Sequence, residues 1–385
     1  MLQVPAKPAF VDTAVSYEKD AETAVRDIAA QLETSGTCFL LVFVPDGLSL
    51  DRLAAALNAQ FAGLPVFGCT TAGQITPQGY ETDALLVLSF PKAHFRCATH
   101  LVSPLKPLSI KEVAADARRL SAQFQRTANW SRLALTLSDG LSKQEDMLVA
   151  ALQSGLEDMP VFGGSAGNGL NFRETSVLHM GRFHSNAALV LLLETDLQFT
   201  GLGFDHFLPT DKQMVVTEAV PEERLALEIN GSPAAEEYAR LVGLRVDELS
   251  PQVFAENPVL VRNHELYHVR AIQGVQDGNA LSFLSAIDVG LLLTLGHGQE
   301  ILRTLHDELA LGGSQGKPPD FILGFDCFLR KLEIEQKDLT GPASGILKRH
   351  RVLGFNTYGE QHCGVHVNQT FVGVAFYEPK RRALH

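Results

Sequence analysis

An internal repeat is the feature that most restricts how this chain can fold. Each copy has an apolar run, then Asp-Gly-Leu-Ser, then large apolar residues at four-residue spacing, and then Pro-Val-Phe-Gly. The blocks lie at 39–44, 46–49, 53–61 and 65–68 in the first copy, and at 133–137, 139–142, 148–156 and 160–163 in the second. The aspartates are 93 residues apart and the phenylalanines 95. So constant an offset over four blocks argues against coincidence.

Each copy predicts a strand, a helix and a second, parallel strand. Short runs that are wholly apolar are typical of buried strands, and apolar residues at every fourth position are typical of an amphipathic helix. Ser142 to Glu145 has the spacing of a capping box, and Ser49 holds the corresponding place in the first copy. A Gly-rich turn and a third strand follow, the latter at 84–90 and 187–193. The repeated unit is therefore predicted to be β-α-β-turn-β.

A third, weaker copy lies near the C-terminus, with a strand at 321–325, a longer helical stretch, the segment 352–359 and a last strand at 370–377. The segment between the second and third copies has another pattern. Serine, proline and glycine mark the ends of a helix over 232–243. Apolar runs broken by Asp-Gly-Asn then indicate an antiparallel meander.

These patterns predict a mixed α/β fold, in which repeated β-α-β-β units form two domains with mixed sheets flanked by helices. We place an N-terminal extension with a helix at 1–35 and a first domain at 36–225, which holds the copies at about 38–90 and 133–193. The second domain, at 226–380, holds the meander and the third copy.

The charge balance disfavours nucleic acid and anionic membranes as main partners. The chain has 44 acidic and 32 basic residues, for a net charge of −12, and such a field repels phosphate groups. The longest apolar stretches are about a third of the roughly 20 residues that a membrane span needs. The start of the chain has no secretory signal pattern, and its five cysteines include no Cys-x-x-Cys pair. We therefore expect a cytoplasmic protein.

The Gly-rich turns at 68–73 and 163–167 are candidate binding loops. Such turns can direct several main-chain N–H groups at one anionic group, such as a carboxylate or a haem propionate. Thr70, Thr71 and Ser165 could add hydroxyl donors. For any single turn, the alternative is that the glycines only permit a tight backbone bend.

The chain resembles the FIST sensory domain at an ordered set of motifs. They are Gly-Cys-Thr-Thr-Ala-Gly at 68–73, Gly-Gly-Ser-Ala-Gly at 163–167, Tyr-His-Val-Arg-Ala at 267–271, Cys327 with Arg330, Tyr-Gly-Glu at 358–360 and Asn-Gln-Thr at 368–370. The resemblance covers about residues 36–377 and implies an N-terminal and a C-terminal FIST part. It implies a bacterial signal-transduction input domain that binds a small ligand, with amino acids as the proposed class. Some stand-alone members, the NosP-type proteins, bind haem, sense nitric oxide and regulate histidine kinases or cyclic-di-GMP enzymes.

Several residues outside the first two turns are also candidates. Arg270 could pair with a ligand carboxylate through two hydrogen bonds, or could form an ordinary salt bridge. Glu360 could bind an α-amino group, or could simply lie exposed. Cys69 and Cys327 could act as thiolates, although free cysteines are more often buried apolar residues. The full candidate set for ligand binding is Gly68, Cys69, Thr70, Thr71, Gly73, Gly163, Gly164, Ser165, Gly167, Arg270, Cys327, Arg330, Tyr358, Gly359 and Glu360.

Histidines supply the candidates for a metal or a haem. A non-covalent haem b needs an axial ligand in an apolar pocket; His268 is the first candidate, and His184 and His366 are alternatives. The stretch 264–268 matches the His-Glu-x-x-His pattern of zinc proteases, but its surroundings favour strands, whereas that site requires a helix. His362, Cys363 and His366 have no standard metal spacing.

The sequence thus predicts a sensory protein rather than an enzyme, with three related loops that point into one cavity. Haem and a small carboxylate or amino-acid metabolite are the candidate ligands. A histidine kinase or a cyclic-di-GMP enzyme is the expected partner, and a homodimer is the expected assembly. The alternative from another class is a metal-dependent or Cys69-dependent hydrolase.

Overall fold

Three six-stranded sheets with the same strand order form the body of the molecule. The computed structural model describes residues 7–169, 172–263, 266–312, 316–362 and 364–379. The first sheet has the order β1 (Asp12–Ser16), β6 (Leu85–Pro91), β2 (Thr37–Val44), β3 (Val66–Thr70), β10 (Val177–His179) and β11 (Arg182–His184). The second has β7 (Phe95–Val102), β12 (Ala188–Thr195), β8 (Ser131–Ser138), β9 (Val161–Ser165), β24 (Glu360–His362) and β25 (Val365–Val367). The third has β13 (Leu197–Phe204), β26 (Phe371–Pro379), β22 (Phe321–Cys327), β23 (Val352–Thr357), β4 (Gln74–Thr76) and β5 (Gly79–Glu81).

The predicted repeat is confirmed, and the third copy is as complete as the other two. In each sheet the two central strands are parallel and their neighbours antiparallel. The register makes Gly68, Gly163 and Gly354 equivalent, because each lies opposite the same position of the parallel partner strand. A Cβ at any of the three would lie 1.8 or 1.9 Å from the facing carbonyl oxygen. Glycine is therefore required at this position.

The three units exchange hairpins in a closed cycle. The hairpin that leaves the first unit, β4–β5, pairs with β23 of the third sheet. The hairpin of the second unit, β10–β11, pairs with β3 of the first sheet, and that of the third unit, β24–β25, pairs with β9 of the second. Each sheet is therefore completed by a neighbouring unit.

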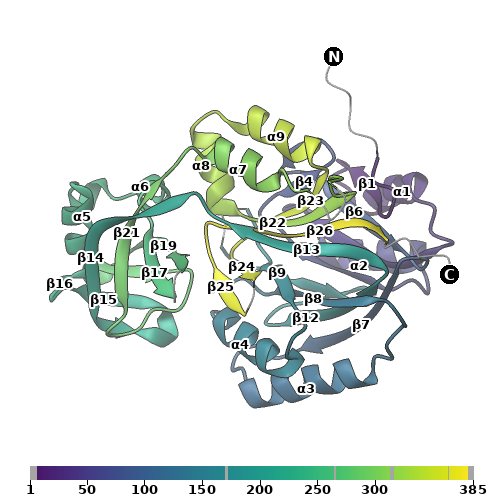
Figure 1. The fold of residues 1–385 in the computed structure, drawn as a ribbon, viewed down its shortest axis with the longest axis horizontal. Coiled ribbons are helices and arrows are strands. Elements are labelled where there is room, and N and C mark those ends of the chain that lie inside the picture. Colours follow the sequence, from purple (N-terminus) through teal and green to yellow (C-terminus); the bar gives the residue numbers. More distant parts are fainter. Residues whose placement is uncertain (1–6, 170–171, 264–265, 313–315, 363, 380–385) are drawn as a thin grey trace.

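Helices cover the outer faces of the sheets, and phenylalanines fill the space between the inner faces. The helices are α1 (Ala21–Gln31) and α2 (Leu50–Gln60) on the first sheet, α3 (Ile110–Gln123) and α4 (Glu145–Leu156) on the second, and α7 (Ile301–Leu309), α8 (Phe328–Gln336) and α9 (Thr340–Arg349) at the third (Figure 1). Phe43 of the first sheet contacts Phe355 of the third at a ring distance of 4.7 Å. Phe95 of the second contacts Phe376 of the third at 5.8 Å.

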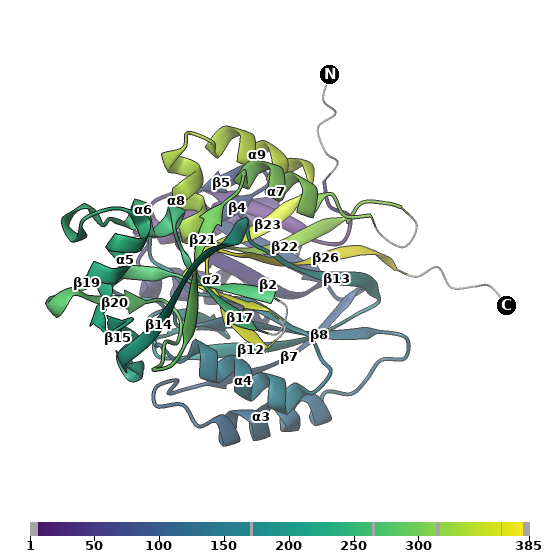
Figure 2. The same cartoon turned by 60° about the vertical axis from the view of Figure 1, so that its left-hand side comes forward.

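A separate module is inserted between β13 and α7. It contains β14 (Phe207–Val220), β15 (Leu225–Ile229), β16 (Ser232–Pro233), α5 (Ala234–Val242), α6 (Pro251–Glu256), β17 (Val259–Asn263), β18 (Leu266–Arg270), β19 (Ile272–Gln276), β20 (Ala280–Phe283) and β21 (Leu292–Gly298), with short 3-10 turns at Pro221–Glu223, Val246–Glu248 and Asp277–Asn279. Its strand pairs are antiparallel, as the predicted meander requires. Both views show it beside the three-sheet body (Figures 1 and 2). The domain boundaries proposed at 36 and 226 stay predictions.

Within the described ranges, no helix has both the length and the apolar content needed to cross a bilayer.

Candidate functional site

The three equivalent turns meet at the centre of the body, where we had predicted that they point into one cavity and hold a ligand. Main-chain hydrogen bonds run in a circle from each unit to the next: Gly167 N to Thr70 O at 3.0 Å, Ala72 N to Asn356 O at 3.0 Å, and Tyr358 N to Ser165 O at 3.2 Å. A second circle runs the other way: Thr70 N to Ser176 O at 3.0 Å, Ser165 N to Gly359 O at 2.8 Å, and Asn356 N to Gly73 O at 2.8 Å. The turns therefore fasten the units to one another.

These circles change the expected role of the turns. The prediction was that main-chain N–H groups of residues 68–73 and 163–167 hold a ligand, but the N–H groups of Thr70, Ser165 and Gly167 donate to neighbouring turns. An N–H group that already donates to a carbonyl is not available to an anion. Donors for a ligand must come from side chains near the turns.

The side chains of the first two turns are also engaged within the protein. Thr71 Oγ1 donates to Val44 O at 2.9 Å, and Ser165 Oγ lies 3.2 Å from Ser138 Oγ and 3.0 Å from Gln361 Nε2. Gly68, Gly163 and Gly164 lie in buried strand positions. These residues build the junction of the three units.

Cys69 does not have the properties of a nucleophile. It is fully buried in β3, and burial raises the pKa of its thiol well above the usual value. A nucleophilic cysteine needs a lowered pKa and access to substrate. The structure therefore gives no support to a Cys69 hydrolase.

Cys327, Arg330 and Glu360 belong to a buried network under α8. Arg330 Nε donates to Asp326 Oδ1 at 2.8 Å, and Arg330 Nη1 lies 3.0 Å from His206 Nδ1. Glu360 accepts hydrogen bonds from the Thr357 hydroxyl and from Thr370 N. Burial raises the pKa of Glu360 well above its usual value, which favours the protonated form of this carboxyl. It was expected to be free to bind an amino group, and the structure instead places it in the interior.

A different charged cluster lies where the module meets the body, beyond the carboxyl ends of the parallel strands, where α/β proteins commonly bind ligands. Arg224 Nη2 bonds to Glu145 Oε2 at 2.7 Å and to Asp146 Oδ2 at 2.9 Å, in the first turn of α4. Arg270 of β18 approaches Asp146 Oδ1 at 3.8 Å and donates through Nη1 to His366 O at 3.1 Å. The cluster thus joins the second unit, the third unit and the module.

Two donors in this cluster lack acceptors. Arg270 Nε and His366 Nε2 are buried and have no hydrogen-bond partner among the described residues. Burial lowers the pKa of His366, although Asp146 and Glu145 oppose this effect, so the ring is neutral at pH 7. His366 Nδ1 lies 3.4 Å from Gln361 Nε2; because an amide nitrogen can only donate, we assign the ring proton to Nε2.

Unpartnered buried donors are costly, at about 1–3 kcal/mol each. Among the described residues, Arg330, His350 and Arg351 also each leave one buried nitrogen unpartnered. At Arg270 and His366 the two donors belong to residues from different parts of the fold, the module and the third unit, that contact each other through Arg270 Nη1 and the His366 carbonyl. An acceptor that binds both would remove the cost, and a carboxylate has two suitable oxygens.

Tyr358 and Gly359 have clear structural roles beside this cluster. A Cβ at Gly359 would lie 2.2 Å from His366 Cε1 and 2.8 Å from Nε2, so this glycine leaves the space that the imidazole occupies. The Tyr358 ring stacks on Phe172 at 4.6 Å and meets Phe328 at 5.2 Å. Tyr358 OH donates to Gly169 O at 3.0 Å and accepts from Asn168 N at 3.1 Å.

The histidines proposed as haem ligands lie on different sheets. His268 is a half-buried residue of β18, and His184 pairs with Val177 at the edge of the first sheet. Burial and the neighbouring Arg270 lower the pKa of His268, which also lies near His362. These polar neighbours do not fit the apolar pocket that a haem needs.

The zinc-protease motif at 264–268 requires a helix, and the structure places its last residue on a strand. His268 lies on a strand, where residues four apart in sequence do not share a helical face; His264 and Glu265 lie outside the described residues, as does Cys363. Across the described ranges, no group of three or more His, Cys, Asp or Glu side chains could hold a metal ion.

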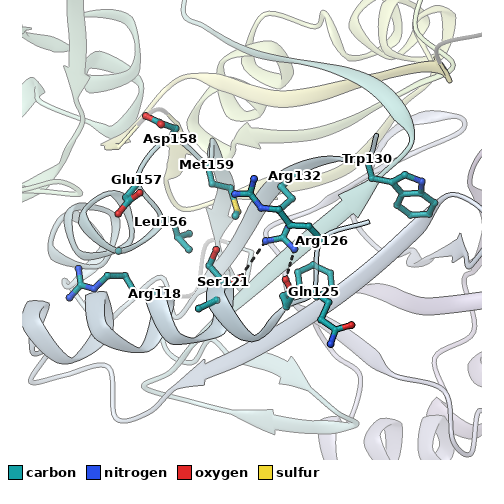
Figure 3. A pocket seen from close by; sticks show the side chains of 13 residues that line it. Arg118, Ser121, Gln125, Arg126, Trp130, Arg132, Leu156, Glu157, Asp158 and Met159 are labelled. Carbon is teal, nitrogen blue, oxygen red and sulfur yellow. Dashed lines mark hydrogen bonds between the residues drawn. The ribbon is translucent and has the colours of Figure 1, made fainter. Parts of the chain in front are cut away.

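A groove of about 740 Å³, here called the α3–α4 groove, lies between the C-terminal ends of α3 and α4 (Figure 3). Arg132 in this groove is fully engaged: Nε bonds to Glu194 at 2.9 Å, and Nη1 bonds to the Ser121 carbonyl at 3.3 Å. Its guanidinium also packs 4.9 Å from the Phe124 ring. Among the described residues that line this groove, no buried side-chain nitrogen lacks a hydrogen-bond partner, in contrast to the Arg270 cluster.

Asp146 and Arg224 were not predicted as site residues. Asp146 follows the Asp-Gly-Leu-Ser block of the second copy, and Arg224 follows Pro-Glu-Glu at the expected domain boundary. A difference between the two copies of the repeat is the one signal that could have identified Asp146 as a candidate. The second copy has an acidic pair at this place, whereas the first copy has Leu53 near it and no acidic pair. No pattern in the sequence predicts that Arg224 contacts Asp146.

Comparisons with known proteins agree with the resemblance seen in the sequence. Residues 10–232 match the FIST N domain, and residues 234–363 match the FIST C domain. The crystal structure of cyanuric acid hydrolase from A. caulinodans is similar with a TM-score of 0.37 and 9% identity, over 96% of this chain and 99% of that chain. A likeness this distant carries no inference about activity. A comparison with curated proteins found no match.

Proposed function

The chain belongs to the FIST family of signal-transduction sensor domains, and we propose that it senses a small carboxylate, with an amino acid as the best-fitting class. The observation that carries this proposal is the pair of unpartnered buried donors, Arg270 Nε and His366 Nε2. A family that binds small ligands and a site that lacks an acceptor point to the same chemistry.

The acidic side of the cluster favours an amino acid over a simple acid. Asp146 Oδ2 already accepts from Arg224 and from Ala286 N, whereas among the described residues Oδ1 has only the distant contact of 3.8 Å with Arg270. Ion pairs are strongest when the groups also share a hydrogen bond, and Oδ1 could form one with a ligand ammonium group. The ligand carboxylate would then bind Arg270 and His366.

The position of the cluster supplies a route for signalling. It lies between α4 of the second unit, β25 of the third unit and β18 of the module. A ligand that contacts residues of both the body and the module would favour one arrangement of the module relative to the body. The size of this shift equals the difference in the binding free energy of the ligand between the two arrangements. We propose that this placement is read by a histidine kinase or a cyclic-di-GMP enzyme, with the protein acting in the cytoplasm as a homodimer.

Binding by isothermal titration calorimetry tests the proposal, with glycine, L-aspartate, L-glutamate, succinate and acetate as probes. At least one amino acid should bind the wild type. Arg270→Gln and His366→Gln should each weaken that binding by about 10- to 100-fold, the loss expected for a charge-assisted or buried hydrogen bond. Arg118→Gln is the matched control, because Arg118 is an exposed arginine of the α3–α4 groove, away from the Arg270 cluster.

Two results would overturn the proposal that the ligand is a carboxylate. One is a wild type that binds none of the probes; the other is an Arg270→Gln variant, shown by circular dichroism to be folded, that binds as tightly as the wild type. An absorption spectrum separates the haem alternative: a Soret band that shifts with nitric oxide and disappears in His268→Ala would assign haem b instead.

A further inference from the structure

Two adjacent stretches of chain connect the module to the body. The chain leaves β13, passes through residues 205–206 and enters β14 (Figure 1). It returns at the end of β21, where Gly298 pairs with Phe207 and Gln299 N donates to His206 O at 2.7 Å. We call residues 205–207 and 298–299 the stem. Any movement of the module relative to the body must turn about the stem.

The side chain of His206 fastens the stem to the third unit. The imidazole has no exposed surface, and its two nitrogens face two residues of α8. Nδ1 lies 3.0 Å from Arg330 Nη1, and Nε2 lies 2.9 Å from Glu333 Oε2. The stem itself contributes Phe207, at a ring distance of 4.1 Å, and residues 298–299, which carry no charge. One side chain of the stem thus makes two buried polar contacts with the body.

These two partners fix the protonation state of the ring. A guanidinium can only donate hydrogen bonds, so Nδ1 of His206 must accept from Arg330 with its lone pair. An ionised carboxylate can only accept, so we assign the single ring proton to Nε2, which donates it to Glu333. This docked arrangement therefore requires a neutral imidazole. A proton added at Nδ1 would remove the acceptor of Arg330 and set two N–H groups against each other across 3.0 Å.

The charges next to His206 are already paired without a proton on the ring. Arg330 forms an ion pair with Asp326 of β22 at 2.8 Å, and Lys337, at the end of α8, forms one with Glu333 at 2.6 Å. Two cations and two carboxylates balance. A proton on the ring would add a fifth charge, with no exposed surface through which water could stabilise it.

The surroundings of His206 in the docked arrangement lower its pKa. Burial has the largest effect, Arg330 and Lys337 act in the same direction, and Glu333 opposes them. Asp205, the carboxyl of the stem itself, accepts from a main-chain N–H at 2.8 Å. A histidine in water has a pKa of about 6.5. Release of His206 from α8 is therefore accompanied by proton uptake below pH 6.5, so acid favours the released state.

We propose that His206 is a pH-sensitive latch, which holds the stem on α8 at neutral pH and releases it in mildly acidic solution. In the docked state Arg330 donates to the neutral ring. In the released state the ring has taken a proton from solvent at Nδ1, the imidazolium is hydrated, and Arg330 keeps its ion pair with Asp326. The module can then turn about the stem. Proton concentration would thus control the placement of the module on the body.

Hydrogen exchange of the full chain, without ligand, measures how often the stem is open. The amides to follow are that of Gln299, which donates to His206 O, and those of β14 and β21 that pair next to the stem. Rates at pH 7.5 and pH 5.5 are corrected for the intrinsic pH dependence of exchange. Through His206 alone, the lower pH should raise the open population by up to about tenfold, the ratio for one group that has a pKa of about 6.5 only when released.

Three variants separate His206 from other titrating groups. His206→Gln keeps an acceptor for Arg330 and a donor for Glu333 but does not titrate, so its stem amides should lack this part of the pH response. His366→Gln removes the buried histidine of the Arg270 cluster and should retain it.

His94→Gln is the matched control. His94 also bonds to a carboxylate, with Nδ1 at 2.9 Å from Asp196 Oδ1, but Asp196 precedes β13 whereas the stem follows it. This pair therefore lies at the opposite end of β13 from the stem. His94→Gln should show the wild-type pH response at the stem amides.

The proposal fails if His206→Gln keeps the whole wild-type pH response, or if the stem amides open only with global unfolding at both pH values. Nitrogen-15 NMR of the wild-type histidines is a second test: His206 should be neutral at pH 7.5 with its proton on Nε2, and a proton on Nδ1 at that pH would overturn the latch. Circular dichroism confirms that each variant is folded. No ligand is present in these experiments, so the latch and the carboxylate proposal stand or fall separately.

Discussion

Residues of one chemical type have different roles here because their partners differ. Arg132 uses its guanidinium within the protein, with Glu194 and the Ser121 carbonyl as partners. Arg270 retains a buried Nε without an acceptor. A buried guanidinium nitrogen gains most from a partner when it has none, and this difference from Arg132 is why we propose Arg270 as a ligand-binding residue.

Glu360 provides a residue-scale prediction about pH. Its pKa in the folded protein lies well above the value of about 4.5 that it has when unfolded, so above pH 4.5 the folded state holds a proton that the unfolded state has lost. The contribution of Glu360 to the free energy of unfolding should then fall as pH rises above 4.5. Glu360→Gln mimics the protonated carboxyl and should remove this part of the decline. Urea unfolding at pH 5 and pH 8 measures the free energy of unfolding of both proteins. An equal decline in the wild type and in Glu360→Gln would contradict the prediction.

Gly354 provides a second prediction at the same scale. A Cβ there would lie 1.8 Å from Gly324 O, and a backbone carbonyl cannot rotate away as a side chain can. Gly354→Ala should cost about 3 kcal/mol or more, at the upper end of overpacking effects. Gly345→Ala in α9 is the control, because nothing lies within 4 Å of its Cβ position; alanine there should stabilise the helix by up to about 1 kcal/mol. Chemical denaturation compares the two, and equal effects would refute the register.

At the scale of elements, helix starts differ from what the sequence predicts. Ser49 is the N-cap residue of α2, as expected, but its side chain makes no capping hydrogen bond. In the second copy α4 begins at Glu145, later than the capping box requires, and Ser142 Oγ accepts from Gln144 N at 3.2 Å instead. This delay places Glu145 and Asp146 in the first turn of α4, where Arg224 reaches both.

The helix α8 supports an element-scale prediction. Arg330 and Asp326 are an ion pair with no exposed surface, so Arg330→Gln would leave a buried carboxylate without its cation. The expected cost is about 3–5 kcal/mol. The control is Arg303→Gln on α7, since Arg303 is 77% exposed and lies 3.7 Å from Asp307; exposed pairs contribute roughly 0–1 kcal/mol. Thermal unfolding distinguishes them, and an equally small effect at Arg330 would show that the network is dispensable.

At the scale of the whole molecule, the cyclic exchange of hairpins makes the three units depend on one another. Each sheet lacks two strands without a neighbouring unit, and the turns of β3, β9 and β23 are joined by main-chain hydrogen bonds. No unit can therefore open without breaking pairs in the other two.

Native-state hydrogen exchange should show this dependence. Amides of β3, β9 and β23 should exchange with the same free energy of opening, that of global unfolding, whereas the inserted module can open separately at a lower free energy. An amino acid bound at Arg270 should raise the protection of β18 and of the first turn of α4. Separate opening free energies for the three sheets would contradict the interlocked body.

The sequence by itself determined the repeating unit and much of its detail. Apolar runs, helical spacing and the Pro-Val-Phe-Gly strands depend on local patterns of burial, and such patterns appear in the sequence as periodic apolar residues. The same patterns predicted the antiparallel character of the module. Arg270 was a candidate because it lies in an alternating strand, where its guanidinium could pair with a carboxylate, and this role stays a prediction.

Only the tertiary structure decided how the units complete one another and which groups remain free. Hairpin exchange joins strands that are hundreds of residues apart, such as β4 with β23, and no local pattern records such a pairing. Whether an N–H group of residues 68–73 can bind a ligand depends on whether it already donates a hydrogen bond to a carbonyl of another unit. The same holds for Arg270, His366 and Asp146, because hydrogen-bond satisfaction is a property of neighbours in space, not of residue type.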